Sequence, residues 1–262
     1  MPARWFNPTR LDQPMSELAS LPLTQPWFLL VIAGTLAAGI VRGLSGFGSA
    51  LIVIPILNIF FGPAIGVPVL TLLDSVLTAP LLPSAFRRCR WREVLPLVIA
   101  AAVFVPLGTQ ILILVDGNLL RRAIALVIIA FVVVMASGWR YHGKSGPLLN
   151  LGVGACAGAM SGAIGISGPP VILFWLGGPS DMSTVRANVI AFFGLLELVT
   201  IASYWLSRLF TGEVLALVLV LAPVYGIALW LGARAFRLVS ERLFRIVSLG
   251  LIALIALLSL LA

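Results

Sequence analysis

The most constraining feature of this sequence is an apolar stretch, GAMSGAIGISGPPVILF, at residues 158–174. Three of its glycines, Gly158, Gly162 and Gly165, recur at the spacing of one helix face. They are followed by Gly-Pro-Pro at 168–170. Each proline lacks a backbone N–H and its ring clashes with the preceding turn, so a helix cannot continue undisturbed through this point. The stretch therefore predicts an apolar helix that is broken in its middle.

A second copy of this pattern, GIVRGLSGFGSALIVIP, occurs earlier in the chain, at residues 39–55. Its glycines Gly39, Gly43 and Gly46 align with the three glycines of the later stretch. The chain therefore contains two copies of the same broken apolar helix.

The correspondence extends beyond the glycines, because Glu-Val-Leu occurs at 93–95 and again at 213–215. Two series of apolar segments also match in order, which indicates an internal duplication. We divide the chain into an N-terminal arm at 1–26, a first repeat at 27–143 and a second repeat at 144–262. The apolar segments run at 27–44, 46–61, 64–83, 94–115 and 123–138 in the first repeat and at 147–162, 166–177, 187–206, 214–231 and 246–262 in the second.

Composition indicates that these segments lie in a membrane. The chain is 61% hydrophobic and 10% charged, whereas a soluble domain is roughly half apolar and a quarter charged. Apolar runs that approach the roughly 20 residues of a transmembrane helix recur along it. We expect an all-α polytopic protein of a bacterial inner membrane. The net charge of +8 does not indicate nucleic-acid binding, because the arginines gather in short loops, as they do on the cytoplasmic side of a membrane.

Some segments are too short to cross the membrane. Segment 166–177 cannot span roughly 30 Å of hydrocarbon as a helix. We expect broken or re-entrant helices to meet near the membrane midplane, where irregular backbone is tolerated only inside protein or beside a cavity. The sequence leaves open whether the first two segments of each repeat span the membrane or re-enter.

The distribution of arginine predicts that the two repeats are inverted relative to each other. Loop 84–92 holds four arginines, whereas its counterpart at 207–213 holds one. The following loop shows the opposite bias, with two arginines at 116–122 and four at 233–245. Because positive loops stay in the cytoplasm, this switch is typical of inverted repeats. The scheme places both termini outside the cytoplasm.

Three strings carry a resemblance to a known family: GFGSALIVIP at 46–55, GISGPPV at 165–171 and VRAN at 185–188. Together they resemble the TauE/SafE sulfite-exporter family of membrane permeases, over about residues 30–260. The resemblance implies movement of small sulfur- or carbon-containing anions, such as sulfite or organosulfonates. Typical members carry a run of three glycines where this chain has Gly-Ser-Ala and Gly-Pro-Pro, a departure that concerns the substrate more than the fold.

The two helix breaks are the candidate anion site. A broken helix leaves backbone N–H groups unpaired at the start of its second half, and the helix dipole makes that end attractive to an oxyanion. Glycines let the backbone approach a ligand, and serine hydroxyls add donors. The alternative is that the G-x-x-x-G glycines only pack helices closely. The residues at the breaks that we assign to substrate binding are Gly46, Gly48, Ser49, Ser167, Gly168, Pro169 and Pro170.

Four further polar residues complete the predicted site. Arg42 either binds a sulfonate-like head with two hydrogen bonds or extends towards the membrane surface from a helix end. Asp74 and Glu197 lie in the third segment of each repeat. Each is a candidate proton carrier, and each could instead pair with an arginine or cap a helix. Asn188 either contacts the substrate or caps the helix that starts beside it.

These features predict a secondary transporter, most simply an exporter, of a small anion such as sulfite or an organosulfonate. The alternative is an anion channel, or a permease for another small carboxylate or sulfur anion. An intramembrane enzyme is disfavoured, because no H-E-x-x-H occurs and the one histidine, His142, lies outside the apolar segments. No G-x-x-x-x-G-K-[ST] occurs, which disfavours an ATP-driven pump. We expect no catalytic residue, no cofactor and no metal, with the anion and the lipid bilayer as partners; the sequence leaves a homo-oligomer open.

Overall fold

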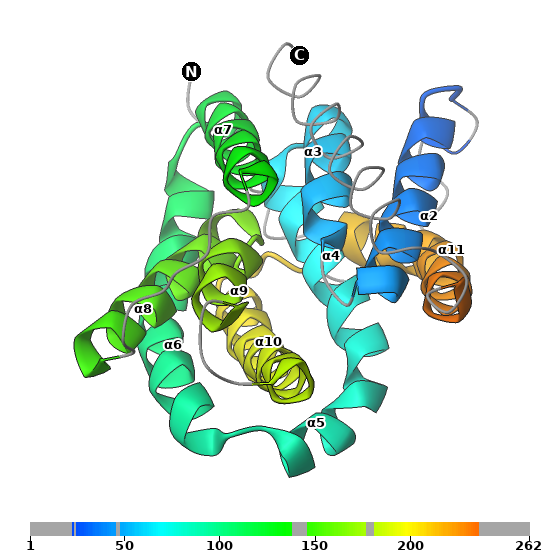
Figure 1. Cartoon of the computed structure of the whole chain (residues 1–262). Coiled ribbons are helices and arrows are strands. Elements are labelled where there is room, and N and C mark those ends of the chain that lie inside the picture. Colours follow the sequence, from blue (N-terminus) through cyan, green and yellow to red (C-terminus); the bar gives the residue numbers. More distant parts are fainter. Residues whose placement is uncertain (1–22, 24, 46–47, 138–145, 177–180, 236–262) are drawn as a thin grey trace.

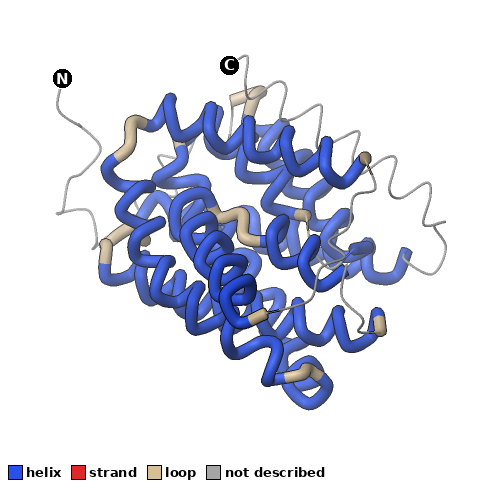
Figure 2. The backbone as a smooth tube through the Cα atoms, turned by 60° about the vertical axis from the view of Figure 1, so that its left-hand side comes forward, coloured by secondary structure: helices blue, strands red, loops and turns tan. Residues whose placement is uncertain are grey.

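The computed structural model describes residues 23, 25–45, 48–137, 146–176 and 181–235, and within them it contains helices and no strand (Figure 1, Figure 2). The all-α prediction is therefore confirmed for this part of the chain. The elements of the first repeat are α2 (Phe28–Ser45), α3 (Ser49–Phe61), α4 (Pro63–Thr78), the 3₁₀ turn η2 (Ala79–Leu81), α5 (Leu82–Arg88), α6 (Trp91–Leu114) and α7 (Gly117–Ala136). Those of the second are α8 (Pro147–Ile164), α9 (Gly168–Leu176), α10 (Met182–Leu206) and α11 (Gly212–Ala235).

The break predicted in the second repeat is confirmed, and the backbone geometry explains it. α8 ends at Ile164, and Gly165 has a φ of 67°, a left-handed conformation that glycine adopts without strain. α9 begins at Gly168, so its two prolines fall in the first turn, where a missing N–H removes no bond within the helix. A Cβ on Gly165 would lie 2.8 Å from Ile54 and 3.0 Å from Val67. The break therefore packs tightly against the first repeat.

The first repeat is broken at the equivalent place. α2 ends at Ser45, and α3 begins at Ser49 after Gly48, whose φ is 96°. The offset that aligns Gly39 with Gly158 also aligns the first residues of α3 and α9. Both repeats thus start a new helix at the same position, as the duplicated motif predicts.

Three helices of the described chain, α6, α10 and α11, are long and apolar enough to cross a membrane. The apolar parts of α2, α3, α4 and α8 are shorter, and the nine residues of α9 extend only about 14 Å. Large apolar side chains such as Ile99, Val103 and Leu107 lie exposed along α6, which suits contact with lipid. The chain is therefore an integral membrane protein that combines spanning helices with shorter ones.

The first described helix of each repeat packs against a long apolar helix of the other repeat. α2 lies along α11, and α8 lies along α6 (Figure 1). A Cβ on Gly158 would lie 2.2 Å from the carbonyl oxygen of Ala101 on α6, and a Cβ on Gly39 would lie 2.9 Å from that of Tyr225 on α11. Only glycine permits such close approach of two helix backbones. Close packing thus accounts for these two glycines, and the exchange of partners is reciprocal between the repeats.

One predicted loop contains a helix. Residues 84–92 are expected from the sequence to form a loop, but α5 occupies its first half and ends with Arg87 and Arg88. Arginines in a last turn interact favourably with the negative end of the helix dipole, so the charges that mark the loop also stabilise this helix. The predicted positions of both termini, and the apolar segment 246–262, lie outside the described residues.

Candidate functional site

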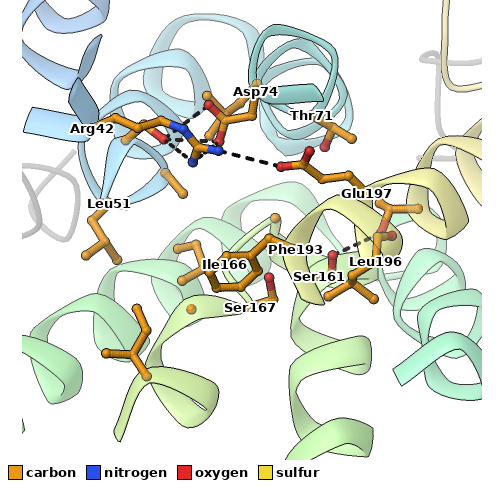
Figure 3. A pocket seen from close by; sticks show the side chains of 18 of the residues that line it. Arg42, Leu51, Thr71, Asp74, Ser161, Ile166, Ser167, Phe193, Leu196 and Glu197 are labelled. Atoms are coloured by element: carbon orange, nitrogen blue, oxygen red, sulfur yellow. Dashed lines mark hydrogen bonds and ion pairs between the residues drawn. The ribbon is translucent and has the colours of Figure 1, made fainter. Parts of the chain in front are cut away.

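A cavity of about 70 Å³ lies between the two helix breaks and is lined by both repeats (Figure 3). A buried water needs roughly 10–15 Å³ of such space, so the cavity has room for a small anion. Leu51, Ile166 and Phe193 form apolar parts of its wall. The polar side chains that line it are Arg42, Ser49, Thr71 and Asp74 from the first repeat and Ser161, Ser167, Glu197 and Thr200 from the second.

Arg42, in the last turn of α2, points towards α4 and the second repeat (Figure 3). Its Nη1 lies 2.8 Å from Asp74 Oδ2 and donates a second hydrogen bond to Ser49 Oγ at 3.3 Å. The Arg42 side chain is only 11% exposed, so it does not extend away from the helix bundle. The structure places the Arg42 guanidinium at the cavity, and the binding of a substrate by Arg42 stays a prediction.

Asp74, on α4, is the counter-ion of Arg42 and is held by further donors. Ser49 Oγ donates to Oδ1 at 3.3 Å and to Oδ2 at 3.1 Å. The Tyr225 hydroxyl, on α11, also donates to Oδ1. These contacts satisfy a carboxylate that is almost completely buried. Among the roles that the sequence left open for Asp74, the structure thus supports pairing with an arginine.

Glu197, on α10, approaches the same arginine from the second repeat (Figure 3). Its Oε1 lies 3.8 Å from Arg42 Nη2, an ion-pair contact that is too long for a hydrogen bond. Its side chain is 19% exposed, more than that of Asp74. Arg42 therefore stands between two carboxylates that come from different repeats.

The second repeat adds neutral hydroxyl groups to the cavity. Ser161 Oγ and Thr200 Oγ1 lie 3.0 Å apart. The Tyr204 hydroxyl donates to the carbonyl oxygens of Ser161 at 3.0 Å and Gly162 at 2.9 Å. Because carbonyls in the last turn of a helix lack a full set of helical partners, Tyr204 satisfies the end of α8 at the break.

Both α3 and α9 begin at the cavity, where Gly48 and Ser49 line one side and Gly168 lines the other. The first N–H groups of a helix have no partner within it and carry the positive end of its dipole. In α9 the second and third residues are Pro169 and Pro170, which have no N–H. The first turn of α3 contains no proline. The Leu51 N–H of α3 already donates to the Gly48 carbonyl at 3.2 Å. The two breaks therefore differ by the N–H of Ala50, which stands where the second repeat has Pro169.

Asn188 lies away from the cavity. Its Nδ2 donates to Glu93 Oε2 at 2.8 Å, and its Oδ1 accepts a hydrogen bond from the Arg90 N–H at 2.7 Å. It therefore ties α10 to the start of α6. Asn188 precedes Glu197 by nine residues, which is about 14 Å along α10.

The other predicted substrate-binding residues divide into three groups. Gly48, Ser49, Ser167 and Gly168 line the cavity together with Arg42. Pro170 is not among its described lining residues. Gly46 and the side chain of Pro169 lie outside the described part of the structure.

Sequence reasoning missed several polar residues of this region. A tyrosine inside an apolar segment is a signal, because a buried hydroxyl needs a partner. Nothing in the sequence, however, shows that Tyr225 meets Asp74. Ser161 lies within the glycine motif, but its contact with Thr200 depends on how α8 packs against α10.

Within the described residues no group of three or more His, Cys, Asp or Glu side chains could hold a metal ion.

The comparisons with known proteins agree with the architecture. No curated protein and no solved structure matches the chain significantly. A family model described as sulfite exporter TauE/SafE matches residues 30–259 and so covers both repeats. The resemblance found in the sequence motifs is thereby confirmed, and the chain belongs to the sulfite exporter TauE/SafE family.

Proposed function

We propose that this protein is a secondary transporter that exports a small sulfur oxyanion, sulfite or an organosulfonate, across a bacterial inner membrane. The observation that carries the proposal is a buried guanidinium, Arg42, in a cavity between two helix breaks. A membrane protein of the sulfite exporter family needs a place where an anion leaves water, and this cavity has the chemistry to receive it.

The expected binding mode follows from the donors around the cavity. The Arg42 guanidinium offers charge and up to two parallel hydrogen bonds to neighbouring oxygens of a sulfonate or sulfite. The first N–H groups of α3 and the Ser167 hydroxyl add neutral donors. Apolar side chains such as Phe193 leave little water to compete with these contacts.

The arrangement of the repeats supports a carrier with a central site. Transporters built from inverted repeats commonly bind substrate near the midplane, between broken helices from the two halves. The reciprocal packing of α2 on α11 and α8 on α6 supports a comparable relation here. We propose that movement between the repeats opens the cavity to each side of the membrane in turn.

Anion binding to the purified full-length protein tests the proposal directly. Titration calorimetry with sulfite, sulfoacetate, taurine and simple carboxylates identifies the preferred class. Arg42→Gln should weaken binding by at least about 1.5–3 kcal/mol, the contribution of one hydrogen bond to a charged group. Arg186→Gln is the matched control, because Arg186 is exposed and does not line the cavity. Equal sulfite affinity in the parent and Arg42→Gln would place the site elsewhere.

Counterflow separates a carrier from a channel. In proteoliposomes loaded with unlabelled sulfite, a carrier accumulates labelled sulfite transiently, because one substrate molecule is exchanged for another. A channel lets both species run down their gradients without such exchange. Accumulation that is absent in the parent protein would favour the channel alternative.

A further inference from the structure

The cavity carries more negative than positive charge. Among the described residues that line it, Arg42 is the cation and Asp74 and Glu197 are the two acidic side chains. An anion that enters this space meets net negative charge as long as both carboxylates are ionised, and repulsion between like charges is strong where water is scarce. Anion binding at Arg42 therefore calls for the neutralisation of one carboxylate.

Asp74 is poorly suited to that change. Its Oδ2 accepts a hydrogen bond from Arg42 at 2.8 Å, and its Oδ1 accepts one from Tyr225. A proton on Oδ2 would set an O–H donor against the Arg42 N–H, and a proton on Oδ1 would require the Tyr225 hydroxyl to turn from donor to acceptor. Asp74 is therefore a fixed counter-ion that keeps Arg42 in place.

Glu197 is tied less tightly. Arg42 of α2 faces it at 3.8 Å, beyond hydrogen-bonding distance, and the other charged group that faces it is Asp74 of α4. Ser75 of α4 is a neutral hydroxyl neighbour. A proton on Glu197 removes one long ion-pair contact and breaks no short bond to the guanidinium.

The other helices packed against α10 bring no further charge close to Glu197. On α5, Arg87 and Arg88 are exposed. On α6, Arg92 is exposed, and Glu93 accepts a hydrogen bond from Asn188 near the start of α10. In the described range α8 carries one titratable group, the exposed Cys156, and α9 carries none.

We propose that Glu197 takes up one proton when a monovalent anion binds to Arg42, so that the protein carries the anion and the proton together. This inference rests on the proposed function, to which it adds a coupling ion. The proton comes from the aqueous side to which the cavity is open and bonds to a carboxylate oxygen of Glu197. The 3.8 Å contact is then given up, and the anion replaces the Glu197 carboxylate as the negative group beside Arg42 Nη2. One anion and one proton together leave the charge of the cavity unchanged.

The direction of coupling follows from this balance. Because proton and anion occupy the cavity at the same time, they move across the membrane in the same direction, so net export requires an outward gradient of the anion that exceeds the inward gradient of protons. A proton exchanger would instead need the two to compete for the cavity.

Calorimetry on the purified full-length protein counts the protons. Methanesulfonate is the first probe, because it has no titratable proton near neutral pH; sulfite is the second, with its own ionisation measured separately and subtracted. Each is titrated in two buffers of different ionisation enthalpy between about pH 6 and pH 9, and the difference in heat gives the protons taken up per anion. We expect uptake to rise towards one proton per anion with pH, while affinity falls by up to about tenfold per pH unit.

Glu197→Gln keeps the size of the side chain but cannot take up a proton. We expect it to bind the anion without proton uptake and with an affinity that no longer depends on pH. Glu213→Gln is the matched control, because Glu213 lies at the start of α11 and does not line the cavity. It should behave like the parent protein.

The outcomes distinguish this inference from the proposed function. Anion binding without proton uptake in the parent protein would overturn the inference and leave the proposed function standing. Proton uptake that persists in Glu197→Gln would also overturn it, since another group would then accept the proton. If neither methanesulfonate nor sulfite binds, both proposals fail.

Discussion

At the break between α2 and α3 a guanidinium and a carboxylate meet, whereas at the break between α8 and α9 the polar side chains are hydroxyls. The offset that aligns the glycine motifs also aligns Arg42 with Ser161. It likewise aligns the N–H groups of Ala50 and Leu51 with two prolines. The two copies therefore share a backbone design but differ in charge and in hydrogen-bond donors.

This difference indicates a division of labour between the repeats. The first break holds the cation and, at Ala50, a backbone N–H that the second break lacks at Pro169, so we expect it to bind most of the anion's charge. The second break, with its left-handed Gly165 packed against Ile54 and Val67, shapes the opposite wall. Duplication can thus preserve a helix break while only one copy keeps the binding chemistry.

The largest effect that we expect at the second break comes from filling its wall. A Cβ on Gly168 would lie 3.4 Å from Ile172 and 3.7 Å from Phe193, which are ordinary contacts, so the backbone accepts a side chain. The outer atoms of Gly168→Leu would occupy the small cavity, and sulfite binding measured by calorimetry should fall beyond detection in a folded protein. Gly152→Leu is the control, because nothing lies within 4 Å of a Cβ on Gly152. Undiminished binding in Gly168→Leu would mean that the anion does not use the second break.

We expect a smaller effect when the stability of the protein is compared between a variant at the first break and a variant at the second. Asp74→Asn removes the carboxylate charge beside Arg42, and removing one partner of a buried ion pair costs about 3–5 kcal/mol. We expect the lower end, because Glu197 still faces the guanidinium. The comparison is Ser161→Ala, which removes one neutral hydrogen bond worth about 1 kcal/mol. Thermal unfolding in detergent measures both, and equal shifts in the two variants would contradict a charged break that is costlier to disturb.

The smallest effect concerns a single hydroxyl at the second break. Ser167 lines the cavity, so Ser167→Ala should weaken anion binding by roughly one hydrogen bond to a charged group, about 1.5–3 kcal/mol. Ser137→Ala is the control, because its exposed hydroxyl donates to the carbonyl of Val134 outside the cavity. An unchanged sulfite affinity in Ser167→Ala would confine the binding contacts to the first repeat.

Much of the fold could be predicted from the sequence because its determinants are local. Gly165 and the prolines of 168–170 end one helix and start another by their own backbone preferences. Long apolar runs likewise specify the spanning helices. The short helix α5 was missed because its arginines indicate the cytoplasmic side without indicating the backbone conformation.

The candidate site was only partly predictable because its contacts join distant segments. Arg42, Asp74 and Glu197 stand out as ionisable residues in apolar segments, and such residues are functional candidates in a membrane. Which of the two carboxylates holds the arginine depends on where α4 and α10 lie relative to the end of α2 in the folded chain, and no local sequence pattern shows this. The same holds for Tyr225, whose hydroxyl reaches Asp74 from α11.

The reciprocal packing of the repeats has a consequence for the order in which the chain is made. α2 leaves the ribosome early, yet the helix that fills its glycine surface, α11, is synthesised only after most of the chain. Arg42, at the end of α2, finds its partner earlier, because Asp74 follows it within the same repeat. During biosynthesis the arginine is therefore neutralised well before α2 packs against α11, and the newly inserted first half must remain in the membrane with this face of α2 uncovered until the second half arrives.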